Sequence, residues 1–291
     1  MEQVPPFVNW KFMNKLLFFL LIFIPFISQA YEWDKSDNSV SLKKGGKVIW
    51  THVHDPNEAK PYFHPLNTPS GTILTELKPR DHVWHRGLWF SWKFINGVNY
   101  WEEKNGRSAG TSQIQSVKVK TLDDFSAVIT MHLDYFQKAD KVLLREKRVM
   151  KISAPDNGAY SISWNSEFTA QEKIFLDRTP IPGQQGGKSY GGYAGISVRA
   201  ALDLRKKKDW QFVNENGEKV KHGQPARHVS FQGKNAAITI FTETEQMDKW
   251  YITKGMPYFS PAILFENSKT LAKDEKLKLS YKIKVEDKTA K

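Results

Sequence analysis

The residues best suited to chemistry gather in one stretch of the chain. Five of the eight histidines and four of the ten tryptophans fall between positions 52 and 101. They are His52, His54, His64, His82 and His85, with Trp84, Trp89, Trp92 and Trp101. Imidazole titrates near neutral pH and binds metals, so clustered histidines suit acid–base or metal chemistry. Indole offers a flat apolar face against which a ligand ring can stack.

The segment Asp81-His82-Val83-Trp84-His85 is the strongest acid–base candidate. In an extended strand His82 and His85 would point to opposite faces, whereas in a turn they converge. The segment follows Pro79 and precedes a predicted strand over 87–94, which favours a turn. A carboxylate such as Asp81 can orient a neighbouring imidazole. We expect both histidines to be catalytic, the alternative being a pair that caps a loop by backbone hydrogen bonds.

A second pair, His52-x-His54, lies at the end of a predicted strand over 48–53. Strand alternation places both side chains on one face, as a metal site requires. No spacing fixes a third ligand, so we expect no bound metal. The open alternative is a copper or zinc centre built on His52, His54, His64, His82 and His85.

Two later segments carry further candidates. Tyr190-Gly-Gly-Tyr193 can stack two rings on a sugar, and Arg199 follows on a predicted strand. Glu266 closes the proline-framed aromatic segment 256–266, where a carboxylate is either a general base or a paired structural group. The sequence has no Gly-x-Ser-x-Gly nucleophile motif, no dinucleotide fingerprint and no Walker loop.

The composition excludes several classes of site. The 291 residues include no cysteine, so disulfides, zinc–thiolate sites, iron–sulfur clusters and cysteine nucleophiles are ruled out. The formal net charge of +12 is compatible with nucleic acid, anionic lipid or acidic polysaccharide. The one dense basic run, 205–208, is typical of a solvated loop.

The first 30 residues predict a secretory signal peptide. Lys11 and Lys15 precede a 12-residue apolar run over 16–27, and Ser28-Gln29-Ala30 fits a small-x-small cleavage site. The run is too short to span a bilayer comfortably. We expect cleavage after Ala30, a periplasmic or secreted mature chain without a membrane span, and no nucleic-acid partner. Translation can start at Met1 or at Met13.

The elements that must position these residues are strands. Apolar and polar residues alternate with a period of two through most of the chain, and no stretch shows a helical stripe. Long strands at 112–121, 124–136, 141–154 and 158–170 predict a four-strand antiparallel meander. We therefore predict an all-β fold over 31–291, a single domain in which two large, twisted antiparallel sheets form a sandwich.

Five blocks of the sequence resemble an exported bacterial family labelled "PmoA-like" or methane oxygenase PmoA. The blocks are PYFHPLNTPSG (61–71), RDHVWHRGLWFSW (80–92), INGVNYWE (95–102), GGYAGISVR (191–199) and MPYFSPAILFE (256–266). The label implies an oxygenase, which corresponds to the metal-enzyme alternative.

The chain is also similar, more faintly, to the galactose mutarotase superfamily. That resemblance implies a supersandwich in which two histidines, an arginine and a glutamate on one sheet face open and close a sugar ring. His64, His82 or His85, and Glu266 match those residue types. The similarity rests on residue types and fold class and is an analogy.

Together these observations predict an exported carbohydrate-active protein that uses general acid–base chemistry, of epimerase, lyase or hydrolase type. His82 or His85 would donate a proton to the sugar, and His64 or Glu266 would accept one. The side chains expected to contact the substrate, either a small carbohydrate or a polysaccharide, are Arg86, Trp89, Trp92, Tyr190, Tyr193 and Arg199. The alternatives are a non-catalytic carbohydrate-binding protein and a His-ligated metal enzyme.

Overall fold

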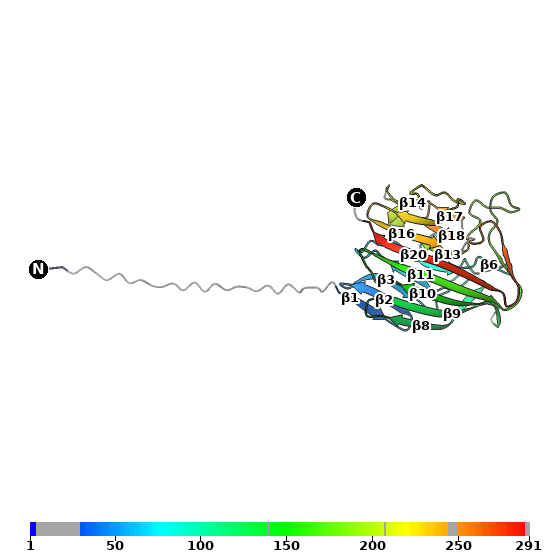
Figure 1. The fold of residues 1–291 in the computed structure, drawn as a ribbon, viewed down its shortest axis with the longest axis horizontal. Coiled ribbons are helices and arrows are strands. Elements are labelled where there is room, and N and C mark those ends of the chain that lie inside the picture. The colour runs from blue at the N-terminus through cyan, green and yellow to red at the C-terminus, as the bar shows by residue number, and fades with distance from the viewer. Residues whose placement is uncertain (4–29, 139, 207, 244–248, 289–291) are drawn as a thin grey trace.

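The protein is represented by a computed structural model. It describes residues 1–3, 30–138, 140–206, 208–243 and 249–288 (Figure 1). The expected signal peptide falls almost entirely on residues 4–29, outside the described residues, so cleavage after Ala30 stays a prediction. Within the described part of the chain, no helix has the length and apolar character needed to cross a membrane.

Eight antiparallel strands form the first sheet, in the order β1-β2-β3-β4-β5-β13-β18-β17. Their bounds are β1 (Tyr31–Lys35), β2 (Ser39–Lys44), β3 (Lys47–Val53), β4 (Tyr62–Leu66), β5 (Leu88–Ser91), β13 (Gly195–Arg199), β17 (Trp250–Thr253) and β18 (Tyr258–Pro261). Strands far apart in the sequence therefore meet in the middle of this sheet, where β5 pairs with β13.

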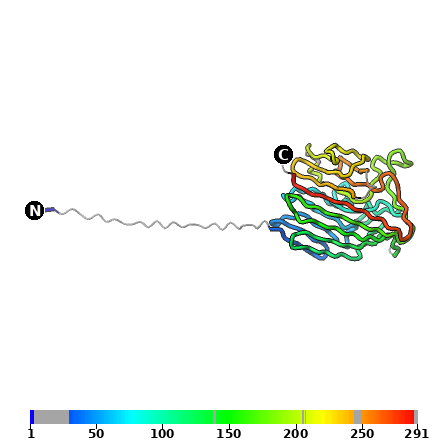
Figure 2. Tube along the Cα trace, in the orientation of Figure 1, coloured from blue at the N-terminus to red at the C-terminus, as the bar shows by residue number. Residues whose placement is uncertain are grey.

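The second sheet also has eight strands, in the order β14-β15-β16-β20-β11-β10-β9-β8. Their bounds are β8 (Thr111–Thr121), β9 (Ala127–Lys138), β10 (Lys141–Ile152), β11 (Ala159–Ala170), β14 (Gln211–Val213), β15 (His228–Gln232), β16 (Ala236–Thr242) and β20 (Lys276–Asp287). The long strands run side by side across the molecule, as the traces in Figures 1 and 2 show.

A small third sheet and one short helix complete the described elements. The sheet has the order β19-β12-β6-β7 and the helix is a single turn. Their bounds are β6 (Phe94–Ile95), β7 (Val98–Asn99), β12 (Ile174–Asp177), β19 (Lys269–Leu271) and α1 (Leu202–Arg205).

The predicted meander is confirmed, because β8, β9, β10 and β11 pair in sequence order. Several strand ends differ from the prediction by one to three residues, most of all at the start of β9. β9 begins at Ala127 rather than at 124, because residues 124–126 form a turn in which Phe125 has a φ of 65°. The Asp124 carboxylate accepts the backbone N–H of Ser126 at 2.9 Å and closes this turn.

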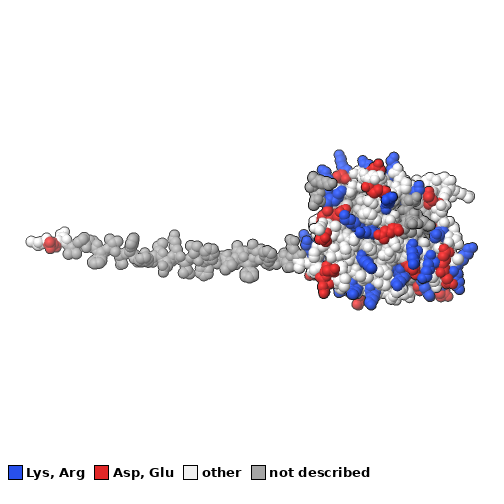
Figure 3. Space-filling model, viewed as in Figure 1, with Lys and Arg blue, Asp and Glu red and all other residues white. Residues whose placement is uncertain are grey.

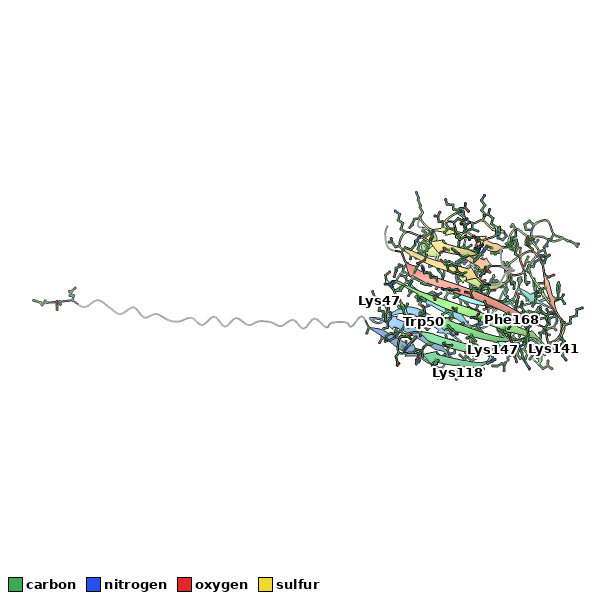
Figure 4. All side chains as sticks on the ribbon, in the orientation of Figure 1. Lys47, Trp50, Lys118, Lys141, Lys147 and Phe168 are labelled. Carbon is green, nitrogen blue, oxygen red and sulfur yellow. The ribbon has the colours of Figure 1, made fainter. Side chains whose placement is uncertain are left out.

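Strand alternation builds the core. Along β20 the residues Leu279, Tyr281 and Ile283 are buried, while Lys278 and Lys282 are exposed. Lys118 of β8 and Lys147 of β10, both labelled in Figure 4, are likewise exposed, whereas Phe168 of β11 is buried. One face of each long strand is therefore apolar and the other faces water.

The two large sheets pack face to face through aromatic side chains. Phe63 of β4 contacts Trp164 of β11 with ring centroids 6.3 Å apart, and Phe90 of β5 contacts Phe168 of β11 at 5.3 Å. The fold is thus a nearly all-β sandwich of large antiparallel sheets, as predicted.

Candidate functional site

The first sheet carries a second apolar cluster on the face opposite the sandwich core. On β5, Phe90 packs into the inter-sheet core, whereas Trp89 belongs to this outer cluster. On β18 the same alternation sends Phe259 inward and Tyr258 outward. A strand period of two explains why adjacent aromatic residues serve different faces.

Above this outer cluster lies a cavity of about 280 Å³. Its walls come from four places: the loop that leads into β5, the residues after β7, the segment before β13, and the β17–β18 hairpin. The lining residues are His82, Trp84, His85, Trp101, Glu102, Tyr190, Tyr193, Tyr251, Met256 and Tyr258. Six of these ten are tryptophan or tyrosine, so a ligand here would be surrounded by ring faces.

The turn expected around His82 and His85 is present. The His85 N–H donates to the His82 carbonyl at 2.9 Å, and the two imidazoles stack with centroids 4.7 Å apart and planes inclined by 25°. The loop enters β5 at Gly87, where φ is +69° and an added Cβ would lie 2.4 Å from the Phe63 carbonyl oxygen. Only glycine fits this close, left-handed position, which fixes where the histidines project.

His82 is oriented by a carboxylate that is itself clamped. His82 Nδ1 lies 3.0 Å from Asp81 Oδ2, an ion-pair distance. Nη2 of Arg199 donates to both Asp81 oxygens, at 3.1 and 3.2 Å. Burial raises the pKa of Asp81, but His82 and Arg199 outweigh it and hold that pKa below its usual value. Asp81 therefore stays ionised, with a carboxylate oxygen 3.0 Å from a His82 Nδ1 that makes no hydrogen bond of good geometry to any described residue.

His85 is a neutral imidazole at the cavity floor. Its ring stacks on Tyr258 at 5.2 Å and packs against Trp89 at 5.0 Å. Burial first, and then electrostatic interaction with His82 and with the cations Arg199, Lys60 and Arg86, hold the pKa of His85 well below 6.5. Its buried Nδ1 has no hydrogen-bond partner among the described residues. A neutral imidazole has one donor nitrogen and one acceptor nitrogen, and it carries no charge.

Glu102 is the carboxylate of the cavity, and sequence reasoning missed it. The hydroxyl of Tyr193 donates to Oε1 at 2.7 Å, the Asn99 amide donates to Oε2 at 2.7 Å, and Lys93 forms a short ion pair with Oε2. Burial raises the pKa of Glu102, but Lys93 and these hydrogen bonds outweigh it, so the pKa is lowered and the group stays ionised. Asn99 also accepts the backbone N–H groups of Trp101 and Glu102, a turn pattern that the sequence NYWE offered as a signal.

A buried ion network supports the wall that bears Trp101 and Glu102. Lys60 donates to the Trp101 carbonyl at 2.8 Å and to Glu103 at 2.5 Å. Arg86 donates to both oxygens of Glu103, at 2.5 and 2.7 Å, and pairs with Glu58 at 3.0 Å. Since a bidentate arginine–carboxylate pair is geometrically specific, this network fixes the position of the wall.

Several predicted site residues therefore have other roles. Arg86 and Arg199 are each 1% exposed and bind carboxylates of the protein, so neither lines the cavity. Trp92 lies in the inter-sheet core, with centroids 5.3 Å from Phe90 and 5.2 Å from Phe168. Trp89 is fully buried beneath the cavity and shapes its floor. Trp92 directly follows β5 and continues the alternation that sends Leu88 and Phe90 into the inter-sheet core, which is why it does not reach the cavity.

His64 and Glu266 are not brought to the histidine pair. His64 Nδ1 lies 3.1 Å from the Thr75 hydroxyl, and burial lowers the pKa of His64 to about 4. Glu266 is exposed, lies 3.7 Å from Lys249, and lines a separate cavity of about 290 Å³ formed by residues 262–269. Tyr190 and Tyr193 do line the candidate cavity, as expected of them.

The five histidines of the metal alternative form two pairs and a single residue. His52 and His54 approach with their Nδ1 atoms 3.3 Å apart, and His52 is fully buried against Phe63. Burial first, and then electrostatic interaction with His54 and Arg148, hold the pKa of His52 well below 6.5. Within the described ranges, no group of three His, Cys, Asp or Glu side chains is arranged to hold a metal ion.

Comparison with known proteins places the chain in a family without naming an activity. No curated protein matches its sequence. Among solved structures it is similar to a galactose mutarotase related enzyme from Lactobacillus acidophilus, with a TM-score of 0.37, 8% identity, and coverage of 90% of this chain and 98% of that one. It is also similar to an alpha-galactosidase from Lactobacillus brevis, with a TM-score of 0.41, 8% identity and coverage of 89% of this chain, which spans only 39% of that enzyme.

The family match covers nearly all of the described sandwich. None of these comparisons carries the methane oxygenase label, so the resemblance to the PmoA-like family stays a prediction. A family model described as "Family of unknown function (DUF6807)" matches residues 39–291, and the protein therefore belongs to that family.

Proposed function

We propose that this protein binds a carbohydrate in the aromatic cavity and that His82 exchanges a proton with the bound sugar. One observation carries the proposal: a single cavity combines several aromatic ring faces with a carboxylate-oriented imidazole and an ionised carboxylate. Aromatic faces and a few placed polar groups are what a site for a ring-shaped polar ligand requires.

The size of the cavity limits the ligand. Its volume of about 280 Å³ lies at the lower end of the roughly 300–1,000 Å³ typical of small-molecule sites. A single sugar ring, or the end of a longer chain, matches that volume. Tyr190 is 55% exposed at the rim, so it is free to cover a ring that has entered.

The proposed chemistry depends on two carboxylates, Asp81 beside His82 and Glu102 in the cavity wall. The Asp81 carboxylate lies beside His82 Nδ1 and favours a proton on that nitrogen. In this proposal Nε2 is the atom that accepts a proton from the sugar or donates one to it. Glu102, held as an anion, accepts hydrogen bonds from sugar hydroxyls or stabilises positive charge at the ring. Oriented general acid–base groups contribute about 10²- to 10⁴-fold to a rate. Epimerase, lyase and hydrolase reactions on a sugar all use such a group.

A binding experiment tests the first half of the proposal. Saturation-transfer NMR with a panel of neutral monosaccharides is expected to detect binding, and Tyr190→Ala is expected to weaken it about 2- to 10-fold by removing one stacking ring. Phe175→Ala is the matched control, because Phe175 is also exposed, at 43%, and does not line the cavity. Equal losses in both variants, or no binding by any sugar, would overturn the proposal.

A proton-exchange experiment tests the second half. Anomer interconversion and solvent deuterium incorporation are followed by NMR for the sugars that bind. His82→Gln is expected to abolish the catalysed exchange, whereas His132→Gln is expected to leave it unchanged, since His132 is an exposed residue on the outer face of β9. If sugars bind and His82→Gln changes no rate, the cavity is a carbohydrate-binding site without acid–base catalysis.

We also propose that the chain is exported, on the strength of residues 1–30 alone. Sequencing the N-terminus of the protein secreted by its own host would test this, with Tyr31 expected as the first residue.

A further inference from the structure

We infer that the aromatic cavity selects neutral or positively charged sugars and rejects sugars that bear a carboxylate or sulfate. This inference rests on the proposed carbohydrate-binding function and names the class of ligand. It runs against the overall charge of +12, which by itself favours acidic ligands. The reason is the set of charges that face the cavity.

The ten lining residues include no lysine and no arginine. Their one carboxylate, Glu102, is kept ionised by its partners. Two lining groups are imidazoles. His85 is held neutral by burial, and any positive charge on His82 would lie 3.0 Å from the Asp81 carboxylate. No lining group therefore offers an unbalanced positive charge to an anion.

The cations just behind the walls are already paired. Lys93 forms its ion pair with Glu102 itself. Lys60 and Arg86 both bind Glu103, with side chains that are at most 4% exposed.

Arg199, the buried cation beside the His82 loop, is shared between Asp81 and Glu76. Of the guanidinium nitrogens of Arg86 and Arg199, only Nη1 of Arg199 has no hydrogen-bond partner among the described residues. That atom is buried, and Arg199 does not line the cavity. Drawing any of these cations toward a ligand would break a buried ion pair, which is costly.

The exposed charges of the surface act on a ligand before it enters the cavity, whereas the charges that line the cavity act on the bound ligand. Basic and acidic side chains are interspersed on the face seen in Figure 3, and exposed charges are screened over about 10 Å at moderate ionic strength. They can raise the encounter rate of an anion with the protein. Inside the cavity a ligand carboxylate would lie close to Glu102, which lines the cavity, and farther from its partner Lys93, which does not. The nearer charge therefore decides which ligand is retained.

The test compares matched sugars that differ by one charge. Glucose and galactose are titrated against glucuronate and galacturonate, and against glucosamine and galactosamine. Uronates are compared with their parents by NMR competition at about pH 8, where ordinary imidazoles are uncharged. Amino sugars are compared with their parents at about pH 6.5, because a 2-amino sugar, like an α-amino group, has lost most of its charge by about pH 8. Each uronate is expected to bind about tenfold more weakly than its parent, or worse, and each amino sugar at least as tightly as its parent.

Two variants assign the effect. Glu102→Gln is expected to remove the uronate penalty or to reverse it, because it removes the anion, keeps the shape and leaves Lys93 without its carboxylate partner. Glu266→Gln is the matched control, since Glu266 is an exposed glutamate of a separate cavity, and it is expected to leave the difference intact. The comparison in the unmodified protein needs no variant and carries the test if Glu102→Gln fails to fold.

The outcomes separate this inference from the proposal on which it rests. If no sugar of any charge binds, the proposed function fails. If neutral sugars bind and uronates bind equally well or better, the function stands and the charge selectivity is overturned. A uronate penalty that survives unchanged in a folded Glu102→Gln protein would overturn the assignment to Glu102.

Discussion

Replacing Lys60 with methionine should change how the stability of the protein depends on pH. Lys60 is 3% exposed and lies between the Trp101 carbonyl and Glu103. Burial lowers the pKa of Lys60 from 10.5 to about 8, and the Glu103 carboxylate offsets only part of that shift. Between those two values the folded protein has lost a proton that the unfolded chain still binds.

The direction and size of the change in the free energy of unfolding follow from this difference in bound protons. Where the unfolded state binds more protons, the free energy of unfolding rises with pH. For one group with pKa values of about 8 and 10.5, the rise from about pH 7 to about pH 9.5 is about 2 kcal/mol. Above that range buried tyrosines act in the opposite direction, because burial raises the pKa of phenols such as that of Tyr62, to about 12.

The assay is urea unfolding followed by tryptophan fluorescence at several pH values in this range. The unmodified protein is expected to gain about 2 kcal/mol relative to Lys60→Met, whose methionine cannot titrate. Lys118→Met, an exposed lysine on β8, is the control and should follow the unmodified protein. Parallel profiles for the unmodified protein and Lys60→Met would refute the argument that burial governs Lys60.

Three further substitutions test the assignments at the site. Asp81→Asn is expected to lower any proton-exchange rate of a bound sugar by about 10²- to 10⁴-fold, with little change in NMR-measured affinity, because Asp81 orients His82 without lining the cavity. Trp92→Ala is expected to lower the free energy of unfolding by about 3–5 kcal/mol in urea melts, as for other buried aromatic side chains, and to leave sugar affinity unchanged. Tyr193→Phe removes a hydroxyl that donates to Glu102, so the pKa of Glu102, read from its carboxyl ¹³C shift, is expected to rise.

Each of these has a result that contradicts it. A large loss of sugar affinity in Asp81→Asn would mean that Asp81 contacts the ligand. Weaker sugar binding by a folded Trp92→Ala protein would return Trp92 to the site. An unchanged Glu102 titration in Tyr193→Phe would show that Lys93 alone sets that pKa.

The strands were predictable because their signal is local. In β20 the alternation of Leu277, Leu279 and Tyr281 with lysines specifies one buried face, and the meander from β8 to β11 needs only short turns between neighbours. The convergence of His82 and His85 was also predictable from the sequence, because it depends on one turn next to Pro79.

The partners of those histidines were not predictable, because they come from distant parts of the chain. Glu102 reaches the cavity only because the segment after β7 folds beside the loop before β5, and the Asn99 turn that precedes Glu102 does not by itself mark it as a site residue over Glu266. Arg86 and Arg199 look like ligand-binding residues until the fold brings Glu103 and Asp81 to them. Charge pairing across a sheet is a tertiary property that a sequence pattern does not contain.

The most direct test of the central claim uses the methionine of the cavity as a reporter. In protein labelled with ¹³C at the methionine methyl groups, Met256 lines the cavity, whereas Met131 and Met150 are buried in the inter-sheet core. Titration with a neutral monosaccharide that binds is expected to shift the Met256 methyl signal saturably and to leave the two core signals in place. If no carbohydrate moves the Met256 signal, or if sugars bind while it stays fixed, this cavity is not the carbohydrate site.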